Sequence, residues 1–146
     1  MYKHILLPTD GSELSSKAVR QGIALAKALN AKVTGITVTI PFHVFTVDAQ
    51  ALADTAETYK KRTDNLAAKY TSEVKNAAVA AGVSYDAMIC IEHEHPYRAI
   101  IDAANKNGCD LIAMASHGRR GISAVVLGNE TVKVLTHSNI PVLVYR

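Results

Sequence analysis

The chain has 146 residues, of which 49% are hydrophobic and 20% charged, a balance typical of one globular domain with its own core. Its formal net charge of +3 is not strongly clustered and only 5% of its residues are aromatic, which argues against nucleic acid as a partner. Cys90 and Cys109 lie in or beside apolar segments, which predicts buried free thiols. Neither a signal peptide nor an apolar stretch of the ~18 residues of a membrane helix is evident. We therefore expect a cytoplasmic protein.

Apolar segments that favour strands alternate along the chain with segments of helical spacing. Five segments favour strands: residues 4–8, 32–40, 84–92, 110–115 and 141–146. Four segments favour helices, and they start at or near Ser12, Asp48, Pro96 and Thr131. The second continues to Gly82 and would reach about 50 Å, so we expect its first turns to protrude or to be broken. Val132 and Leu135 supply the helical spacing of the last one.

This alternation predicts an α/β fold, with a doubly wound, Rossmann-like parallel sheet and helices on both of its faces. No repeat or linker interrupts it, so residues 1–146 are expected to form a single domain. In such sheets ligands bind beyond the carboxyl ends of the strands, where the strand order reverses. That rule directs attention to the segments after the first four strands: residues 8–12, 38–40, 92–96 and 115–121.

The segment around the end of the fourth predicted strand, residues 114–130, has the composition of an anion site. It contains three glycines and two arginines: Gly118, Gly121, Gly128, Arg119 and Arg120. Loop amides near glycines and the N-terminus of a helix can converge on a phosphate. The alternative is that the glycines only shape a turn and the arginines are solvated. Spacing alone leaves both open, because neither standard phosphate-binding fingerprint is present.

Asp10 ends the first predicted strand, near the expected reversal of strand order. Its carboxylate could accept hydrogen bonds from a ribose hydroxyl or help to hold a metal ion attached to phosphate. Aspartate in such a position also commonly bonds its own loop or the start of a helix. The residues by themselves favour neither interpretation.

Two histidine-containing patterns are weaker candidates. His93 and His95 would point the same way along a strand, but no third and fourth ligands are evident, so no metal site is predicted. Ser116 and His117 are adjacent, and sequence neighbours seldom place a hydroxyl at hydrogen-bond distance from an imidazole. No hydrolase motif surrounds them, and no catalytic residue is predicted.

Taken together, these segments resemble the universal stress protein family over the whole chain. The opening HILLPTDGSELSSKAV is similar to the family's first strand, aspartate loop and first helix. The closing CDLIAMASHGRRGISAVVLGNETVKVLTHSNIPVLVYR is the more specific part. Members that bind ATP carry glycine, two residues, glycine, nine residues, glycine, and then serine or threonine. Gly118 and Gly128 match the second and third of these glycines.

The chain departs from that pattern at Ala115, in place of the first glycine, and at Asn129, in place of the hydroxyl residue. A methyl group at Ala115 matters only if the backbone there has a positive φ or touches the ligand. Asn129 keeps a backbone N–H and a side-chain amide that can donate to phosphate. Glu94 stands where the family often has glycine and adds charge at the end of the third strand. The site is therefore expected to be modified rather than lost.

The resemblance implies a five-stranded sheet in the order 3-2-1-4-5 that binds ATP or another adenine nucleotide, with or without Mg²⁺ or Mn²⁺. The implied contacts to adenine and ribose are Pro8, Thr9, Asp10 and Val38. The implied contacts to ribose and phosphates are Ala115, Ser116, His117, Gly118, Arg119, Arg120, Gly121, Gly128, Asn129, Glu130 and Thr131. It also implies a homodimer through residues 141–146, which would otherwise be an exposed apolar edge.

The leading hypothesis is a homodimeric, nucleotide-binding sensor or regulator of stress responses that is not a fast enzyme and has no nucleic-acid or membrane partner. The alternative is a dimeric interaction or scaffold protein whose pocket, altered at Ala115 and Asn129, binds no nucleotide. Slow ATP hydrolysis would need a base that positions water, and only His117 and Asp10 are candidates. The preferred nucleotide, the protein partner and the role of residues 42–51 stay open.

Overall fold

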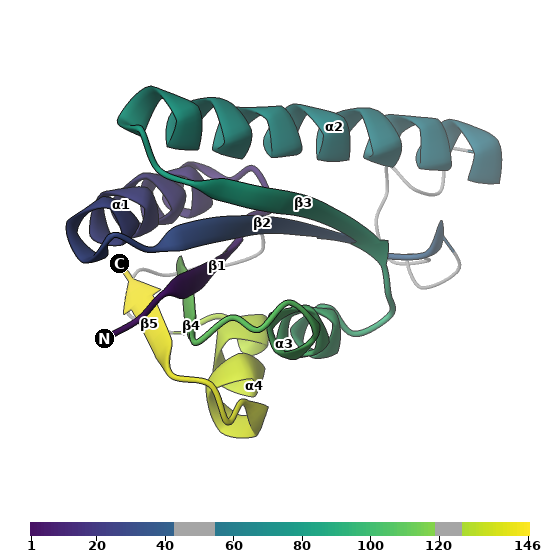
Figure 1. Ribbon diagram of the computed structural model, residues 1–146. Helices are drawn as coiled ribbons and strands as arrows, with labels where there is room; N and C mark the ends of the chain where they lie inside the picture. The colour runs from purple at the N-terminus through teal and green to yellow at the C-terminus, as the bar shows by residue number, and fades with distance from the viewer. Residues whose placement is uncertain (43–54, 119–126) are drawn as a thin grey trace.

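The computed structural model describes residues 1–42, 55–118 and 127–146. Within them it is an α/β fold whose strands follow the order β3-β2-β1-β4-β5, with every neighbouring pair parallel (Figure 1). The strands are β1 (His4–Pro8), β2 (Lys32–Thr39), β3 (Tyr85–Glu92), β4 (Leu111–Ala115) and β5 (Val142–Tyr145). The helices are α1 (Glu13–Leu29), α2 (Ala56–Ala81), α3 (Pro96–Lys106) and α4 (Asn129–His137). The predicted fold class and strand order are confirmed.

The sheet lies between two helical layers, with α1 and α2 on one face and α3 and α4 on the other (Figure 1). Successive residues of β1 alternate between them: Ile5 and Leu7 belong to the core under α1 and α2, and Leu6 belongs to the core over α3. All five residues of β1 are buried. The central strand is therefore apolar along its whole length instead of alternating with polar residues.

The helix ends explain why these segments are helical where they are. Ser12 accepts a hydrogen bond from the Ser15 N–H at 3.2 Å and so caps the start of α1, as predicted. The backbone of α1 ends in the left-handed conformation at Asn30, with φ of 52°. Gly82, with φ of 70°, ends α2 in the same way. The turn residues that mark the ends of both helices are thus visible in the sequence.

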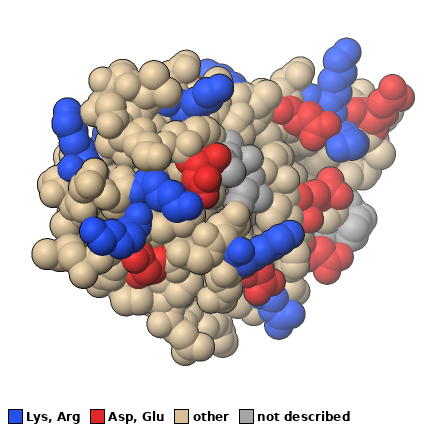
Figure 2. Space-filling model, in the orientation of Figure 1, with Lys and Arg blue, Asp and Glu red and all other residues tan. Residues whose placement is uncertain are grey.

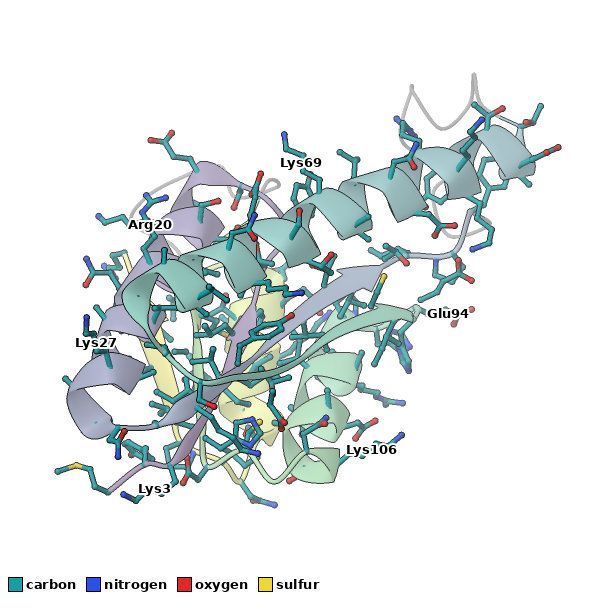
Figure 3. The ribbon with its side chains drawn as sticks, turned by 45° about the horizontal axis from the view of Figure 1, so that its top comes forward. Lys3, Arg20, Lys27, Lys69, Glu94 and Lys106 are labelled. Carbon is teal, nitrogen blue, oxygen red and sulfur yellow. The ribbon has the colours of Figure 1, made fainter. Side chains whose placement is uncertain are left out.

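α2 has 26 residues and so extends for about 39 Å as one unbroken helix. Its first turns extend past the carboxyl ends of β2 and β3, which matches the expected protrusion (Figure 1). The structure begins it at Ala56, and the predicted start near Asp48 lies outside the described residues. Figure 3 shows Lys69 of this helix pointing away from the sheet.

One expectation about burial was wrong. Cys90 is exposed, and only Cys109 is a buried thiol. β3 forms the edge of the sheet, so one side of the strand that carries Cys90 has no neighbouring strand to cover it. In α4 the helical spacing of Val132 and Leu135 does not mark the buried face, because both are exposed while Thr131 and Val134 are buried. The helix packs through a mixed polar and apolar stripe, which a search for apolar spacing does not detect.

Charged side chains of both signs are interspersed on the face shown in Figure 2, in keeping with the small net charge. No helix in the described parts of the chain is long and apolar enough to cross a membrane.

A buried histidine lies in the sheet near the amino ends of the strands. His4 is only 3% exposed, and its Nε2 is 2.7 Å from the Thr34 hydroxyl and 3.9 Å from the Asp86 carboxylate. The Lys32 ammonium, 2.9 Å from the same carboxylate, lies nearby. Burial lowers the pKa of His4 below its ordinary value of 6.5, and the positive charge of Lys32 lowers it further against the opposing effects of Asp86 and Asp110. The fold therefore favours the neutral form of this imidazole.

The lowered pKa makes stability depend on pH with a definite sign. As the pH falls below 6.5, His4 becomes protonated in the unfolded chain before it does so in the folded chain. The free energy of unfolding therefore decreases with falling pH until the pH reaches the pKa of His4 in the folded protein. In His4→Gln, a side-chain amide can replace the bond to Thr34 but cannot titrate. Thermal unfolding of both proteins from about pH 7.5 to about pH 5 should show the wild type losing more stability. Parallel losses would contradict this account of His4.

Candidate functional site

The loops after β1 and β4 and the N-terminus of α4 meet at the carboxyl edge of the sheet. The loop after β1 is tightly bonded. Thr9 is buried, its N–H donates to the Ile36 carbonyl at 2.9 Å, and its carbonyl accepts from the Thr37 hydroxyl at 3.1 Å. The Gly11 N–H donates to the Thr9 hydroxyl at 3.2 Å, and Gly11 has a φ of 73°, where glycine is favoured. The loop is thus held in one conformation by its own hydrogen bonds.

Asp10 takes part in that loop. Its Oδ1 accepts a hydrogen bond from the Ser12 N–H at 3.0 Å, so the interpretation in which Asp10 bonds its own loop is correct for this oxygen. Its Oδ2 lies directly against Gly118 of the loop after β4, where a Cβ atom on Gly118 would overlap it. Gly118 does not have a positive φ. Close approach to the Asp10 carboxylate, and not backbone conformation, therefore favours glycine at position 118.

The loop after β4 is bonded to α4. The Gly128 N–H donates to the Ser116 carbonyl at 2.7 Å, and the Thr131 hydroxyl donates to the Ala115 carbonyl at 3.0 Å. A Cβ on Gly128 would lie 3.1 Å from the Cα of His117, which is tighter than ordinary contact. Gly128 therefore lets the start of α4 approach the end of β4, and the helix N-terminus faces the carboxyl edge with its partial positive charge.

Ala115 does not strain the site. Among the described residues, Asn30 is the one non-glycine residue with a positive φ, so the Ala115 backbone has an ordinary conformation. Ala115 is buried at the end of β4 and paired with Tyr145 of β5. Replacement of glycine by alanine at this position therefore has no conformational cost.

Glu130, one of the predicted nucleotide contacts, is instead bonded to residues of α3 and α4. Its carboxylate accepts from the Tyr97 N–H at 2.8 Å and lies 3.0 Å from the Lys133 ammonium. His95, the N-cap residue of α3, makes no side-chain capping bond, so Glu130 supplies the acceptor for this helix start. Glu130 joins α4 to α3.

Ser116 and His117 correct one expectation. The Ser116 hydroxyl lies 3.1 Å from the His117 Nδ1, within hydrogen-bond distance, although they are sequence neighbours. Ser116 is 3% exposed, so its hydroxyl is poorly placed to attack a substrate. The pair acts as an internal contact of the loop.

The structure brings most of the predicted site residues together. Three groups lie at the carboxyl edge: residues 8–10, 115–118 and 128–131. Val38 lies on the adjacent strand β2, and its side chain packs on the core over α3. Arg119, Arg120 and Gly121 lie outside the described residues. Sequence reasoning missed Tyr70, whose ring packs on Gly11, because its helical spacing shows only that it faces inward.

The two histidines after β3 lie in contact with each other. The His95 N–H donates to the Nδ1 of His93 at 2.8 Å. In the parts of the chain that the structure describes, no three His, Cys, Asp or Glu residues are grouped so that they could hold a metal ion. Figure 3 places Glu94 at this same end of β3.

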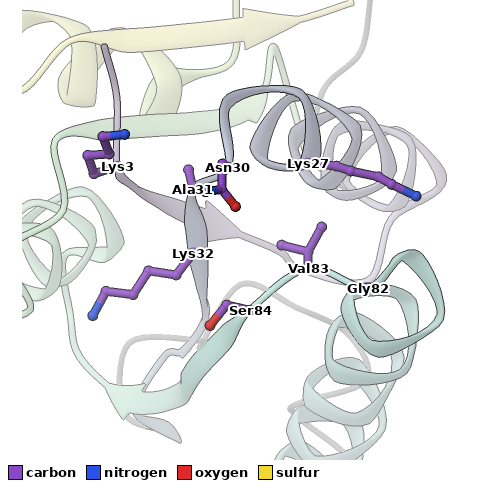
Figure 4. A pocket seen from close by; sticks show the side chains of 8 residues that line it. All are labelled: Lys3, Lys27, Asn30, Ala31, Lys32, Gly82, Val83 and Ser84. Atoms are coloured by element: carbon purple, nitrogen blue, oxygen red, sulfur yellow. The ribbon is translucent and has the colours of Figure 1, made fainter.

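Two cavities lined by described residues lie away from the carboxyl edge. One, of about 480 Å³, opens at the amino ends of β2 and β3 and is lined in part by Lys27 and Lys32 (Figure 4). The two ammonium groups point away from each other, and that of Lys32 pairs with Asp86. The C-terminal ends of α1 and α2 also lie here, with the partial negative charge that disfavours anions. This cavity is therefore poorly suited to bind phosphate.

The contact between Asp10 and Gly118 leads to a test. Gly118→Ala should destabilise the protein by about 1–3 kcal/mol, because the new methyl group displaces the carboxylate. In an Asp10→Ala background the same substitution should cost much less. Urea unfolding of the two single variants and the double variant gives the coupling energy. Additive losses would show that the two residues do not contact each other in solution.

Comparisons with known proteins agree with this geometry. A sequence profile of the universal stress protein family matches residues 1–146. Universal stress protein MJ0531 of Methanocaldococcus jannaschii is 30% identical over all of this chain and 83% of its own length. The solved structure of MJ0577 from the same organism superposes with a TM-score of 0.79 at 27% identity, over 99% of this chain and 95% of that one.

A universal stress protein solved in complex with cAMP has the same fold, with a TM-score of 0.69 at 23% identity, over 99% of this chain and 97% of its own. The profile match covers every residue, and the fold, the strand order and the glycines of the carboxyl edge accord with it. The chain belongs to the universal stress protein family.

Proposed function

We propose that this protein binds an adenine nucleotide, ATP in the first instance, at the carboxyl edge of the sheet. The observation that carries the proposal is the contact between Asp10 and Gly118 beside the N-terminus of α4. It brings a carboxylate that can accept from ribose hydroxyls next to a helix end that favours phosphate. The cAMP complex of a related fold supports an adenine nucleotide as the class of ligand.

The charges of the site favour one orientation of the bound nucleotide. The Asp10 carboxylate repels phosphate and attracts hydroxyl donors, so the ribose belongs near β1. The start of α4, with Gly128 as N-cap and no side-chain capping bond, has amides that suit the phosphates. Mg²⁺ or Mn²⁺, if it accompanies ATP, would bind chiefly to phosphate oxygens, since the described residues offer no cluster of three or more protein ligands.

The two departures from the family pattern are compatible with this role. The Ala115 backbone is unstrained, and Asn129, exposed at the first position of α4, presents an amide where the pattern has a hydroxyl. We propose that both residues, together with Arg119 and Arg120, contribute to the phosphate half of the site.

We further propose that the protein is a cytoplasmic sensor or regulator of stress responses, not a fast enzyme. The two candidate bases for ATP hydrolysis are both used within their loops. Asp10 accepts from Ser12, and His117 Nδ1 lies at hydrogen-bond distance from Ser116.

Thermal unfolding with ATP and magnesium tests nucleotide binding directly. ATP at about a hundred times its dissociation constant should add about 2.7 kcal/mol, a shift of roughly 5–10 °C for a domain of this size. Asp10→Asn keeps an oxygen for Ser12 but loses the charge, and it should give a smaller shift. Ser84→Ala, at the opposite end of the strands, should keep the full shift.

If neither ATP, ADP nor AMP shifts the unfolding of the wild type, the nucleotide proposal fails and the alternative of a dimeric scaffold protein takes its place.

We also propose a homodimer through β5. This strand is at the edge of the sheet and pairs only with β4 among the described strands. Leu143 on it is exposed, and an apolar cavity of about 350 Å³ lies beside it, lined in part by Leu25 and Val142. An edge strand with free backbone groups and apolar side chains favours pairing with a second copy.

Leu143→Lys should dissociate this dimer, because the substitution places two like charges near the symmetry axis. Val79→Lys is the matched control, since Val79 is a more exposed apolar residue on α2, 64% against 37% for Leu143. Light scattering should give about twice the 15.7 kDa chain mass for the wild type and the control, and one chain mass for Leu143→Lys. A monomeric wild type would exclude the dimer.

A further inference from the structure

Two buried tyrosines of α2 lie against segments that lead to the proposed adenosine contacts. Tyr59 and Tyr70 are each 7% exposed. They are eleven positions apart, about three helical turns, so both lie on one stripe of the helix. α2 therefore contacts the chain after β1 and the chain after β2 with the same face.

Tyr70 contacts the loop after β1. A Cβ atom on Gly11 would overlap three atoms of the Tyr70 ring, so the ring packs directly on the backbone of Gly11. Gly11 follows Asp10 immediately, and its N–H is bonded to Thr9. The ring thus blocks one direction in which the Asp10 loop could move.

Such a contact positions a loop only if the ring itself is held in place. Tyr59 supplies one anchor of the helix, because its hydroxyl donates to the Ile40 carbonyl at 2.8 Å and its ring lies 5.3 Å from that of Phe42. Val74 and Ala78 supply the other, since both are buried in the core under α1 and α2. Tyr70 lies between these anchors, so the helix backbone that carries its ring is held on both sides.

We propose that Tyr70 is a positioning residue that holds the Asp10 carboxylate in place for the ribose of the bound nucleotide. The inference rests on the proposed function, because Asp10 must contact the nucleotide for its position to matter. Tyr70 acts through the backbone of Gly11 and needs no contact with the ligand.

Three variants separate positioning from ordinary core packing. Tyr70→Phe keeps the ring, Tyr70→Leu removes it while retaining an apolar side chain, and Val74→Ala removes core packing one turn further along the same stripe. Val74 is 2% exposed and belongs to a core cluster that contains no residue of the Asp10 loop. Its substitution therefore reports the effect of destabilisation alone.

Titration calorimetry with ATP and magnesium gives the affinities. Tyr70→Leu should weaken binding about tenfold, the loss expected for one misplaced hydrogen bond to a charged group. Tyr70→Phe and Val74→Ala should stay within about twofold of the wild type, whatever their melting temperatures. In an Asp10→Ala background, Tyr70→Leu should cause no further loss, because the ring acts through Asp10.

A ligand-free spectrum checks the contact itself. The Tyr70 ring current should displace the Gly11 Hα resonances from their ordinary positions, and this displacement should persist in Tyr70→Phe and Val74→Ala but vanish in Tyr70→Leu.

These experiments distinguish a failure of the proposed function from a failure of the positioning role alone. A wild type that binds neither ATP, ADP nor AMP overturns the proposed function, and this inference with it. A wild type that binds ATP, with equal losses in Tyr70→Leu and Val74→Ala or with no loss in Tyr70→Leu, overturns only the positioning role. An undiminished effect of Tyr70→Leu in the Asp10→Ala background also overturns it.

Discussion

The approach of the Asp10 carboxylate to Gly118 joins the loops after β1 and β4, and the proposed site is built around this contact. β1 and β4 are neighbours in the sheet, and the chain leaves them toward opposite faces, which opens the crevice where such sheets bind ligands. A side chain at position 118 would have to displace the Asp10 carboxylate. The glycine is therefore a condition for the site and not only a means of turning the chain.

Each helical layer is connected to this contact by specific bonds. On one side, α2 meets the Asp10 loop through the ring of Tyr70. On the other, α4 is fixed by the bond from Gly128 to Ser116, and Glu130 extends the connection to α3. The site is thus built on the scaffold on both faces of the sheet, which favours a preorganised pocket. The amino ends of the strands, with their lysines and buried His4, form a separate region.

Local patterns in the sequence predicted the elements, and contacts between distant residues decided the site. The apolar run of β1, the Ser12 cap and the Gly82 stop are local features, so the fold followed from them. The contacts of Gly118 with Asp10 and of Gly11 with Tyr70 join residues far apart in the chain, and no periodicity reveals them. Hydrophobic spacing does not reveal the buried face of α4, because that face includes Thr131, whose hydroxyl donates to the Ala115 carbonyl.

The most direct test of the account is an amide chemical-shift titration of the protein with ATP and magnesium. If the carboxyl edge is the binding site, the largest changes should fall on Gly11, Gly118 and Gly128, while Gly82 and Ser84 at the amino end stay unchanged. Changes confined to the amino end, or none at saturating ATP, would contradict the central claim that the Asp10 and Gly118 loops form a nucleotide site.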